Sequence, residues 1–255
     1  MMIKITERCT MGCKHCLNDA QPYGKDIEIA KLIEIFDFLQ REKIGKFLII
    51  SGGEPTEHRE FDKVMEAILE YQRESQYFHT ITITTNGEQI EKDPEKFKNY
   101  IGRFKTFNCN LIYQVSADVR YYPRRIKVHK RIFREDGFVM CDNCVESIYP
   151  IGRALTNNIK FNRASSQCYN VRALSKQGFD TLWKIESYLR IKGKYCTPHI
   201  SINGEIKLGE SDLCTVCATI NDSSSEIMEK IQKFKCNKCN FINKNLSPQY
   251  RKFVE

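Results

Sequence analysis

The stretch "IKITERCTMGCKHC", residues 3–16, decides the expected fold, because a short apolar strand runs directly into a turn that carries three cysteines. Cys9, Cys13 and Cys16 follow the spacing C-x3-C-x2-C. A structural zinc site needs four protein ligands, and His15, which lies between two of the cysteines, would strain so short a loop as the fourth. Three thiols on one turn therefore predict a metal centre with one coordination position left open for another molecule.

The residues after this turn predict an α/β fold. Strands are expected at residues 3–6, 46–50, 79–87 and 110–118, where short apolar or β-branched runs end in polar turns. Strands separated by amphipathic helices form parallel βα units, and their chemistry lies at the carboxyl ends of the strands. The segments "CTMGCKHC" (9–16), "SGGEP" (51–55) and "TTNG" (84–87) each follow a strand, so we expect them to converge on one rim.

Amphipathic stretches between these strands predict three helices. Asp26 is expected to cap the first of them. Each helix places its apolar residues on one stripe: Ile29, Leu32, Ile33, Phe36 and Leu39 in the first, Phe61, Val64, Met65, Ile68 and Leu69 in the second, and Phe97, Tyr100, Ile101 and Phe104 in the third.

The composition and the pattern of elements change in the last hundred residues. We therefore expect a domain boundary near residue 155, after "YPIGRA" (149–154). Cysteines become frequent there and the alternation of strands and helices stops. "HISINGEIKL" (199–208) predicts a hairpin with Asn203-Gly204 at its tip, and "SSSEIMEKIQKF" (223–234) predicts a capped helix. The expected domains are therefore residues 1–155 and 156–255.

The cysteine turn after the first strand and "GGEP" (52–55) after the second resemble the radical S-adenosylmethionine (SAM) superfamily, over roughly residues 3–154. The resemblance implies a partial (β/α)6 TIM-like barrel and a [4Fe-4S] cluster held by Cys9, Cys13 and Cys16. The fourth iron would bind the amino and carboxylate groups of SAM. Reduction of the cluster by a flavodoxin- or ferredoxin-type donor would cleave SAM to a 5′-deoxyadenosyl radical, which abstracts hydrogen from substrate.

The resemblance also implies further SAM contacts on the strand ends. Gly52 and Gly53 would let the backbone approach closely, and Glu54 would accept from the methionine ammonium. The remaining expected contacts come from the same "GGEP" motif and from later strand ends: Pro55, Asn86, Ser116, Asp118 and Arg153. Ordinary strand-end polarity for Ser116 and Asp118, and a surface ion pair for Arg153, are the alternatives.

A second cysteine pattern lies in the expected C-terminal domain. Cys196, Gly209 and Cys214 form a C-x12-G-x4-C unit that resembles the opening of the SPASM auxiliary-cluster domain, and the closing C-x2-C resembles the shortened Twitch form. The resemblance implies a small cysteine-rich α+β domain with an auxiliary [4Fe-4S] cluster, whose ligands would be Cys196, Cys214, Cys236 and Cys239.

Zinc is the alternative for these thiols. "CTVC" (214–217) and "CNKC" (236–239) have the spacing of a zinc ribbon, which would add Cys217 to the ligands. A further metal site from Cys141, Cys144, Cys168 and Cys217 has only scattered spacing to support it, and Cys109 is expected to be a buried structural residue.

Composition restricts the remaining possibilities. The chain of 255 residues is 41% apolar with a net charge of +8, and it contains no apolar run of the ~20 residues that span a bilayer. No secretory leader opens the chain, so we expect a cytoplasmic protein without a membrane partner, in which the 12 cysteines stay reduced. The basic segment 120–134 indicates either a solvated connection, which we expect first, or capture of an anionic substrate.

Two substrate classes are consistent with the resemblance. The first is a ribosomally synthesised peptide that the enzyme modifies, and the second is a small polyol or amino sugar that it dehydrogenates. Only eight residues precede Cys9, so we expect no amino-terminal leader-binding domain, which weakens the peptide hypothesis. A zinc-ribbon protein that binds nucleic acid is the non-enzyme alternative, but it explains neither "SGGEP" nor the incomplete cysteine trio.

Overall fold

Parallel strands make up most of one eight-stranded sheet in the computed structural model, which describes residues 1–116, 123, 136–141, 151–157, 159, 171–192 and 197–235. The strand order is β5-β4-β3-β2-β1-β6-β7-β8, and every neighbouring pair from β5 to β6 is parallel. The predicted strands are confirmed as β1 (Met2–Thr6), β2 (Phe47–Gly52), β3 (Thr80–Thr85) and β4 (Asn110–Ser116).

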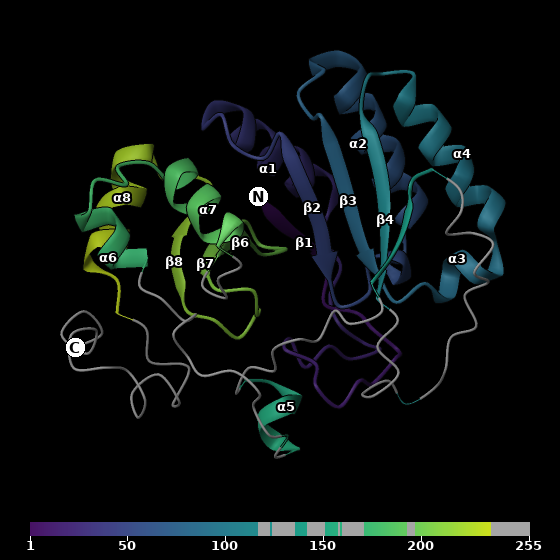
Figure 1. The fold of residues 1–255 in the computed structure, drawn as a ribbon, viewed down its shortest axis with the longest axis horizontal. Coiled ribbons are helices and arrows are strands. Elements are labelled where there is room, and N and C mark those ends of the chain that lie inside the picture. The colour runs from purple at the N-terminus through teal and green to yellow at the C-terminus, as the bar shows by residue number, and fades with distance from the viewer. Residues whose placement is uncertain are drawn as a thin grey trace.

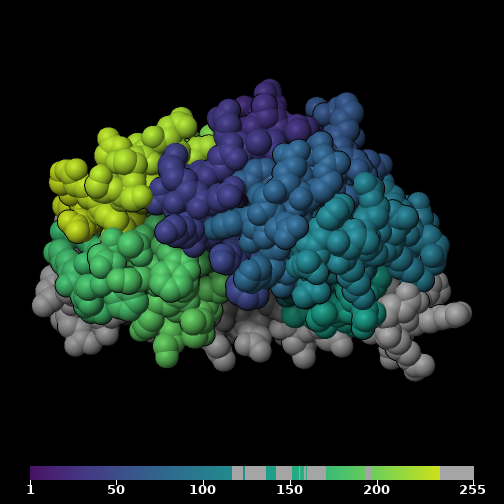
Figure 2. All heavy atoms as spheres, turned by 90° about the horizontal axis from the view of Figure 1, so that it is seen from above, coloured from purple at the N-terminus to yellow at the C-terminus, as the bar shows by residue number. Residues whose placement is uncertain are grey.

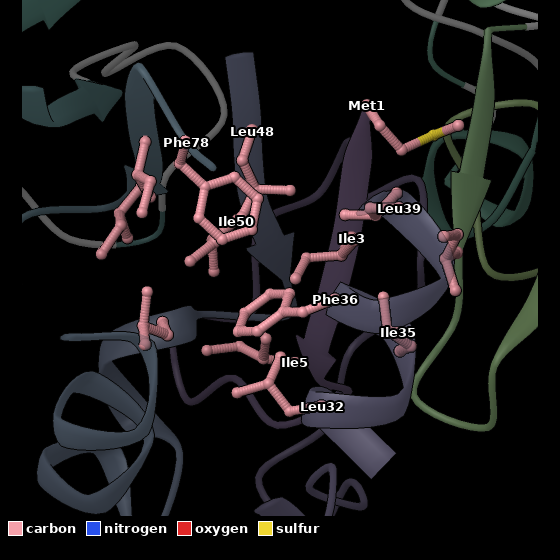
Figure 3. Close-up of a cluster of buried hydrophobic side chains, with 14 of the residues drawn as sticks. Met1, Ile3, Ile5, Leu32, Ile35, Phe36, Leu39, Leu48, Ile50 and Phe78 are labelled. Carbon is pink, nitrogen blue, oxygen red and sulfur yellow. The ribbon is translucent and has the colours of Figure 1, made fainter. Parts of the chain in front are cut away.

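Three helices cover one face of this sheet through the apolar stripes that the sequence predicts. They are α1 (Ile29–Arg41), α2 (Phe61–Ser75) and α4 (Pro94–Lys105). Phe36 of α1 packs between β1 and β2, where it meets Ile5 and Ile50 (Figure 3). Full burial of each such side chain stabilises the fold by about 1.5–3 kcal/mol. The alternate residues of β1–β4 point to the opposite face.

The predicted cap of α1 is wrong. The helix begins after Glu28, which makes no side-chain capping hydrogen bond. Asp26 instead accepts a hydrogen bond of 2.6 Å from Thr6 Oγ1 at the end of β1. Because Asp26 also forms an isolated bridge with Thr6, its side chain is held against the strand end and away from the first turn of α1.

The sheet continues past residue 155. Strand β6 (Pro198–Ile200) pairs in parallel with β1, in the register Met2↔His199, and the predicted hairpin to β7 (Glu205–Leu208) follows it. Strand β8 (Val216–Thr219) completes the sheet, and the predicted last helix is α8 (Ser224–Lys233), with a capping box from Ser223. Figure 2 shows these C-terminal elements lying against the N-terminal ones, and one sheet includes strands from both sides of residue 155. The domain boundary itself stays a prediction.

Several elements were not predicted. Strand β5 (Phe138–Cys141) pairs with β4, and α5 (Arg153–Thr156), α6 (Val171–Lys176) and α7 (Leu182–Ile191) follow it. The sequence pattern could have predicted α7, because Leu182, Ile185 and Leu189 are apolar residues at helical spacing and Thr181 is a helix cap. The short helices η1 (Pro55–Glu57) and α3 (Glu88–Lys92) lie on the strand-end loops.

The carboxyl ends of β1–β4 point to one end of the molecule, where the N-terminal loop after β1 lies beside α5 (Figure 1). This is the rim on which the polar segments were expected to converge. Within the described ranges, no helix is long and apolar enough to cross a membrane.

Two tyrosines, Tyr113 fully buried and Tyr77 half-buried, provide a test of the packing. Tyr113 is fully buried on β4 and its hydroxyl lacks a hydrogen-bond partner among the described residues, whereas the Tyr77 hydroxyl lies 2.8 Å from Leu39 O and 2.7 Å from Ile44 O. We expect Tyr113→Phe to stabilise the protein by about 1 kcal/mol and Tyr77→Phe to destabilise it by about 1 kcal/mol, because only the first hydroxyl is desolvated without compensation. Urea denaturation of the metal-free protein measures both. A Tyr113→Phe protein that loses as much stability as Tyr77→Phe would contradict the packing described.

Candidate active site

Backbone hydrogen bonds bring the ends of β1 and β2 together. The amide of Gly53 donates to Thr6 O over 2.7 Å, and the amide of Glu54 donates to Arg8 O over 2.7 Å. The segment that follows β1 is the cysteine loop (residues 9–20), so these bonds place its first residue next to "SGGEP". The predicted convergence of these two segments is therefore a feature of the structure.

The glycines of "SGGEP" are required by this close approach. A Cβ atom on Gly52 would lie 2.3 Å from Thr6 O, and one on Gly53 would lie 2.2 Å from Arg8 O. Gly52 also has a φ of +149°, a conformation that side chains disfavour. Both glycines thus let the backbone after β2 pass against the backbone after β1. Their expected contact with SAM stays a prediction.

The three cysteines share one small apolar cluster on the cysteine loop. Cys9 is buried with Met11 and Ala20, and Cys13 and Cys16 pack against them half-buried. Burial raises the pKa of both the Cys9 and the Cys13 thiol to about 12, because a surrounding of low polarity disfavours the thiolate. Iron binding replaces the thiol proton and so offsets this cost.

The donor set of the loop fits an iron–sulfur cluster. Three soft thiols lie on one turn, and thiolates are the ligands that such clusters use. In the part of the chain that the structure describes, no three His, Cys, Asp or Glu side chains converge as a ready-made ion site. The three cysteines therefore lie close together on the loop, but their side chains are not arranged as they would be around a bound metal ion.

Glu54 organises the rim from within. Its carboxylate is buried and accepts four hydrogen bonds. Oε1 accepts from the Thr56 amide (3.2 Å), the Thr56 hydroxyl (2.6 Å) and the Thr85 hydroxyl (2.6 Å), and Oε2 accepts from the Asn86 amide (2.6 Å). Burial raises the pKa of this carboxyl, and the four donors act in the opposite direction. Glu54 thus joins the end of β2 to the end of β3.

Asn86 presents an unused donor at this rim. Its side chain is buried, and its Oδ1 accepts from the Glu88 amide over 2.8 Å. Its Nδ2 is buried without a hydrogen-bond partner among the described residues. Because a buried N–H group is costly to leave unpaired, this atom is a natural donor to a polar ligand seated on the rim.

The other predicted contacts are distributed around the rim. Pro55 is buried at the start of η1, and Ser116 ends β4 half-buried, beside Cys141 of β5. Asp118 lies outside the described residues, as does all of the basic segment 120–134 except Pro123. Arg153 lies against the cysteine loop, where its guanidinium donates to Cys13 O and Ala20 O, each over 3.0 Å.

Sequence reasoning missed Asn18, which ties three segments together. Its Nδ2 donates to Gly52 O over 2.9 Å, and its Oδ1 accepts from Lys4 Nζ (2.8 Å) and from the Asp212 amide (3.0 Å). Beside it, the Ser211 hydroxyl donates to Leu17 O over 2.6 Å. These partners are up to 194 residues apart in the chain, so no local sequence pattern predicts the contacts between them.

A profile of the radical SAM superfamily matches residues 3–147, which is more than half of the 255 residues. The chain belongs to the radical SAM superfamily. The match includes the cysteine loop, "SGGEP" and "TTNG", so the family assignment expected from the sequence is confirmed.

Curated relatives of this radical SAM protein include GTP 3′,8-cyclases. The chain is 34% identical to that of Haemophilus ducreyi over 100 residues, which is 36% of this chain and 27% of the relative. It is 34% identical to that of Photorhabdus laumondii over 104 residues, 38% of this chain and 29% of the relative. The chain thus spans less than a third of the length of these relatives.

Solved structures share the fold over most of the chain. BtrN, in complex with AdoMet and 2-DOIA, aligns with a TM-score of 0.54 and 15% identity over 91% of this chain and 84% of its own. Streptococcus suis SuiB, bound to S-adenosylmethionine, aligns with a TM-score of 0.51 and 13% identity over 98% of this chain and 75% of its own. At these identities the likeness is one of fold.

The cysteines expected to form a second metal site are only partly described. Cys214 is buried before β8, where its amide donates to Ser211 O over 2.9 Å, and Cys217 lies half-buried within β8. Cys144, Cys168, Cys196, Cys236 and Cys239 lie beyond the described ranges. The auxiliary cluster and the zinc ribbon both stay predictions.

Replacement of the Glu54 carboxylate tests its organising role. We expect Glu54→Gln to lower the free energy of unfolding by about 2–4 kcal/mol, because the amide places N–H donors against groups that themselves donate. Glu70→Gln is the matched control, since Glu70 is exposed on α2 and pairs with Arg73 at the surface, where an ion pair contributes little. Denaturant titration of the metal-free protein measures both, and equal stability of the two variants would refute the role.

Proposed function

We propose that this radical SAM enzyme holds a [4Fe-4S] cluster on Cys9, Cys13 and Cys16, binds SAM on the adjoining rim and abstracts hydrogen from a polar substrate. One observation carries the proposal. The cysteine loop is joined to the glycine turn after β2 by the hydrogen bond from Asn18 Nδ2 to Gly52 O and, at the residue before the loop, by that from the Glu54 amide to Arg8 O. The Glu54 carboxylate joins this turn to the end of β3 through the Asn86 amide.

The residues of the rim have distinct parts in this proposal. The three thiols bind iron, and the unpaired Asn86 Nδ2 donates to the ribose or carboxylate of SAM. Among the described residues, Oε2 of Glu54 accepts one hydrogen bond, and a carboxylate oxygen can accept a second, here from the methionine ammonium. When bound and reduced, the cluster with SAM supplies a 5′-deoxyadenosyl radical. An electron donor of flavodoxin or ferredoxin type is proposed as the reductant.

The substrate is proposed to lie on the sheet face opposite the helices. Alternation along β2, β3 and β4 places Ile49 and Ile112 on that face, and nearer the carboxyl ends of the strands it places mainly neutral polar side chains there. These are half-buried at Ser51, Thr82, Thr84, Gln114 and Ser116. Hydroxyl and amide groups suit hydrogen bonding to a peptide backbone or to sugar hydroxyls. We place a ribosomally synthesised peptide first, with an anionic one favoured by the net charge of +8.

Two small-molecule substrates are the alternatives. The polar face equally suits a polyol or amino sugar, and the fold likeness to BtrN covers 84% of that chain. A nucleotide is suggested by the GTP 3′,8-cyclases, but the match involves only 100 residues of this chain. A test of the substrate therefore has to compare a peptide, a polyol or amino sugar, and a nucleotide.

Cys196, Cys214, Cys236 and Cys239 are proposed to hold an auxiliary [4Fe-4S] cluster. The position of Cys214 supports this proposal. Cys214 is buried three residues after Ser211, whose hydroxyl donates to Leu17 O of the cysteine loop, so one expected ligand lies near that loop. A zinc ribbon that includes Cys217 is the competing assignment.

Removal of the three loop thiols tests the cluster. We expect the variant with Cys9, Cys13 and Cys16 all replaced by Ala to lose reductive SAM cleavage, because no open iron site remains. After anaerobic reconstitution its iron content should fall from about eight atoms per chain to about four. Cys109→Ala, which removes a buried thiol far from the rim, is the control. Continued formation of 5′-deoxyadenosine by the triple variant would refute the assignment, and about four irons with one zinc in the wild type would favour the ribbon.

Isotope transfer distinguishes the substrate classes. The reduced enzyme is incubated with SAM and, in separate reactions, with the deuterated product of any short precursor gene adjacent to its own, with deuterated 2-DOIA and with deuterated GTP. We expect deuterium in 5′-deoxyadenosine from the peptide reaction alone, measured by mass spectrometry. Transfer from 2-DOIA or from GTP instead would overturn the peptide assignment while leaving the radical mechanism in place.

A further inference from the structure

The segment from Ile151 to Asn157 lies against the cysteine loop, although more than 130 residues separate them in the chain. Arg153 donates three hydrogen bonds to the loop. Its amide donates to Cys16 O, its Nε to Cys13 O and its Nη1 to Ala20 O, each over 3.0 Å. Two of these three acceptors are the carbonyls of residues whose thiols are proposed iron ligands. Figure 1 shows α5 beside the loop that follows β1.

The neighbours of Arg153 reinforce the contact. Gly152 has a φ of +60°, and a Cβ atom there would lie 2.4 Å from Cys16 O, so the backbones touch. Asn157 Nδ2 donates to Lys14 O over 2.9 Å. The later segment therefore holds the half of the loop from Cys13 to Ala20 through its backbone, which leaves the thiols unengaged.

Arg153 also brings a positive charge to the loop. Its side chain is 17% exposed, and its nearest counter-charge is Asp19, with Oδ1 at 3.6 Å from Nη1 and with about half of its side chain exposed. Among the described residues, other charged groups around the loop include Glu57, which binds Thr10 through both of its oxygens, the buried Glu54, and Lys14. Lys4 and Asp212 form an ion pair beside Asn18, at the far end of the loop. A charge in a partly buried site is screened less than one in water.

We infer that Arg153 is a positioning residue that fixes the Cys13–Ala20 half of the cysteine loop and whose charge makes the cluster on this loop easier to reduce. Reduction adds an electron, and a guanidinium that donates to the carbonyl of the ligand residue Cys13 and to Ala20 O stabilises the added negative charge. Hydrogen bonding, charge and burial are the means by which proteins set the potential of iron–sulfur clusters. The inference rests on the proposed function, since it requires a cluster on Cys9, Cys13 and Cys16.

The test separates the charge of Arg153 from its hydrogen bonds. Arg153→Gln removes the charge, Arg153→Lys keeps the charge but not the planar fork, and Asp19→Asn removes the counter-charge. Asn suits position 19, whose φ of +51° lies in the left-handed region that Asn tolerates. Arg73→Gln on the exposed face of α2 is the control. The midpoint potential of the cluster is measured by electron paramagnetic resonance, and amide hydrogen exchange of residues 13–20 is measured on the metal-free protein.

We expect Arg153→Gln to lower the midpoint potential by about 59 mV, a tenfold change in a one-electron equilibrium, and Asp19→Asn to raise it by a smaller amount. Arg153→Lys should keep the wild-type potential, and both Arg153 variants should exchange residues 13–20 faster. Shifts of Arg153→Gln and Asp19→Asn in the same direction, or none in either, would overturn the electrostatic role. Unchanged exchange in both Arg153 variants would overturn the positioning role. The iron content of the wild-type protein tests the proposed function separately. A wild-type protein that holds no cluster on the cysteine loop would refute the proposed function, whereas the outcomes above would refute only the role of Arg153.

Discussion

The buried carboxylate of Glu54 is the constraint on which the rest of the rim depends. Four donors converge on it from the turn after β2 and from the end of β3, and its own amide bonds to the loop after β1. A buried charge is tolerated only when its hydrogen-bonding capacity is met, so these segments must keep their relative positions for the charge to remain buried. The glycines beside it follow from the same requirement, because only a residue without Cβ lets the two backbones come close enough.

The cysteine loop is then held from two sides by parts of the chain that lie far from it in sequence. Arg153 and Asn157 bind its carbonyls on one side, and Ser211 binds Leu17 O on the other. Asn18 links the loop to Gly52 and to buried Lys4. All of these contacts engage backbone or amide groups, so the loop is positioned while its thiols stay available for iron.

The C-terminal elements are part of this arrangement. Strand β6 pairs with β1, and the turn after β7 supplies Ser211 and Asp212 to the cysteine loop. Arg41 at the end of α1 also donates to Ile220 O over 3.0 Å. A segment that looked separate in composition thus supports the rim directly. The amide of Cys214, three residues beyond Ser211, is bonded to the same turn.

Local sequence determined the βα units and the segments that carry the chemistry. The buried positions of α2 and α4 agree with the apolar spacing, and "SGGEP" and "TTNG" lie at strand ends as expected, because periodicity and turn residues act over a few neighbours. Asp26 shows the limit of such reasoning. Its carboxylate was expected to cap α1, but it accepts a hydrogen bond from the Thr6 hydroxyl instead. Only the tertiary structure decided that β6 lies beside β1, that Glu54 joins β2 to β3 and that Arg153 binds the cysteine loop. Those contacts join residues tens to hundreds of positions apart, and several of them end on backbone carbonyls, which every residue carries and no sequence pattern distinguishes.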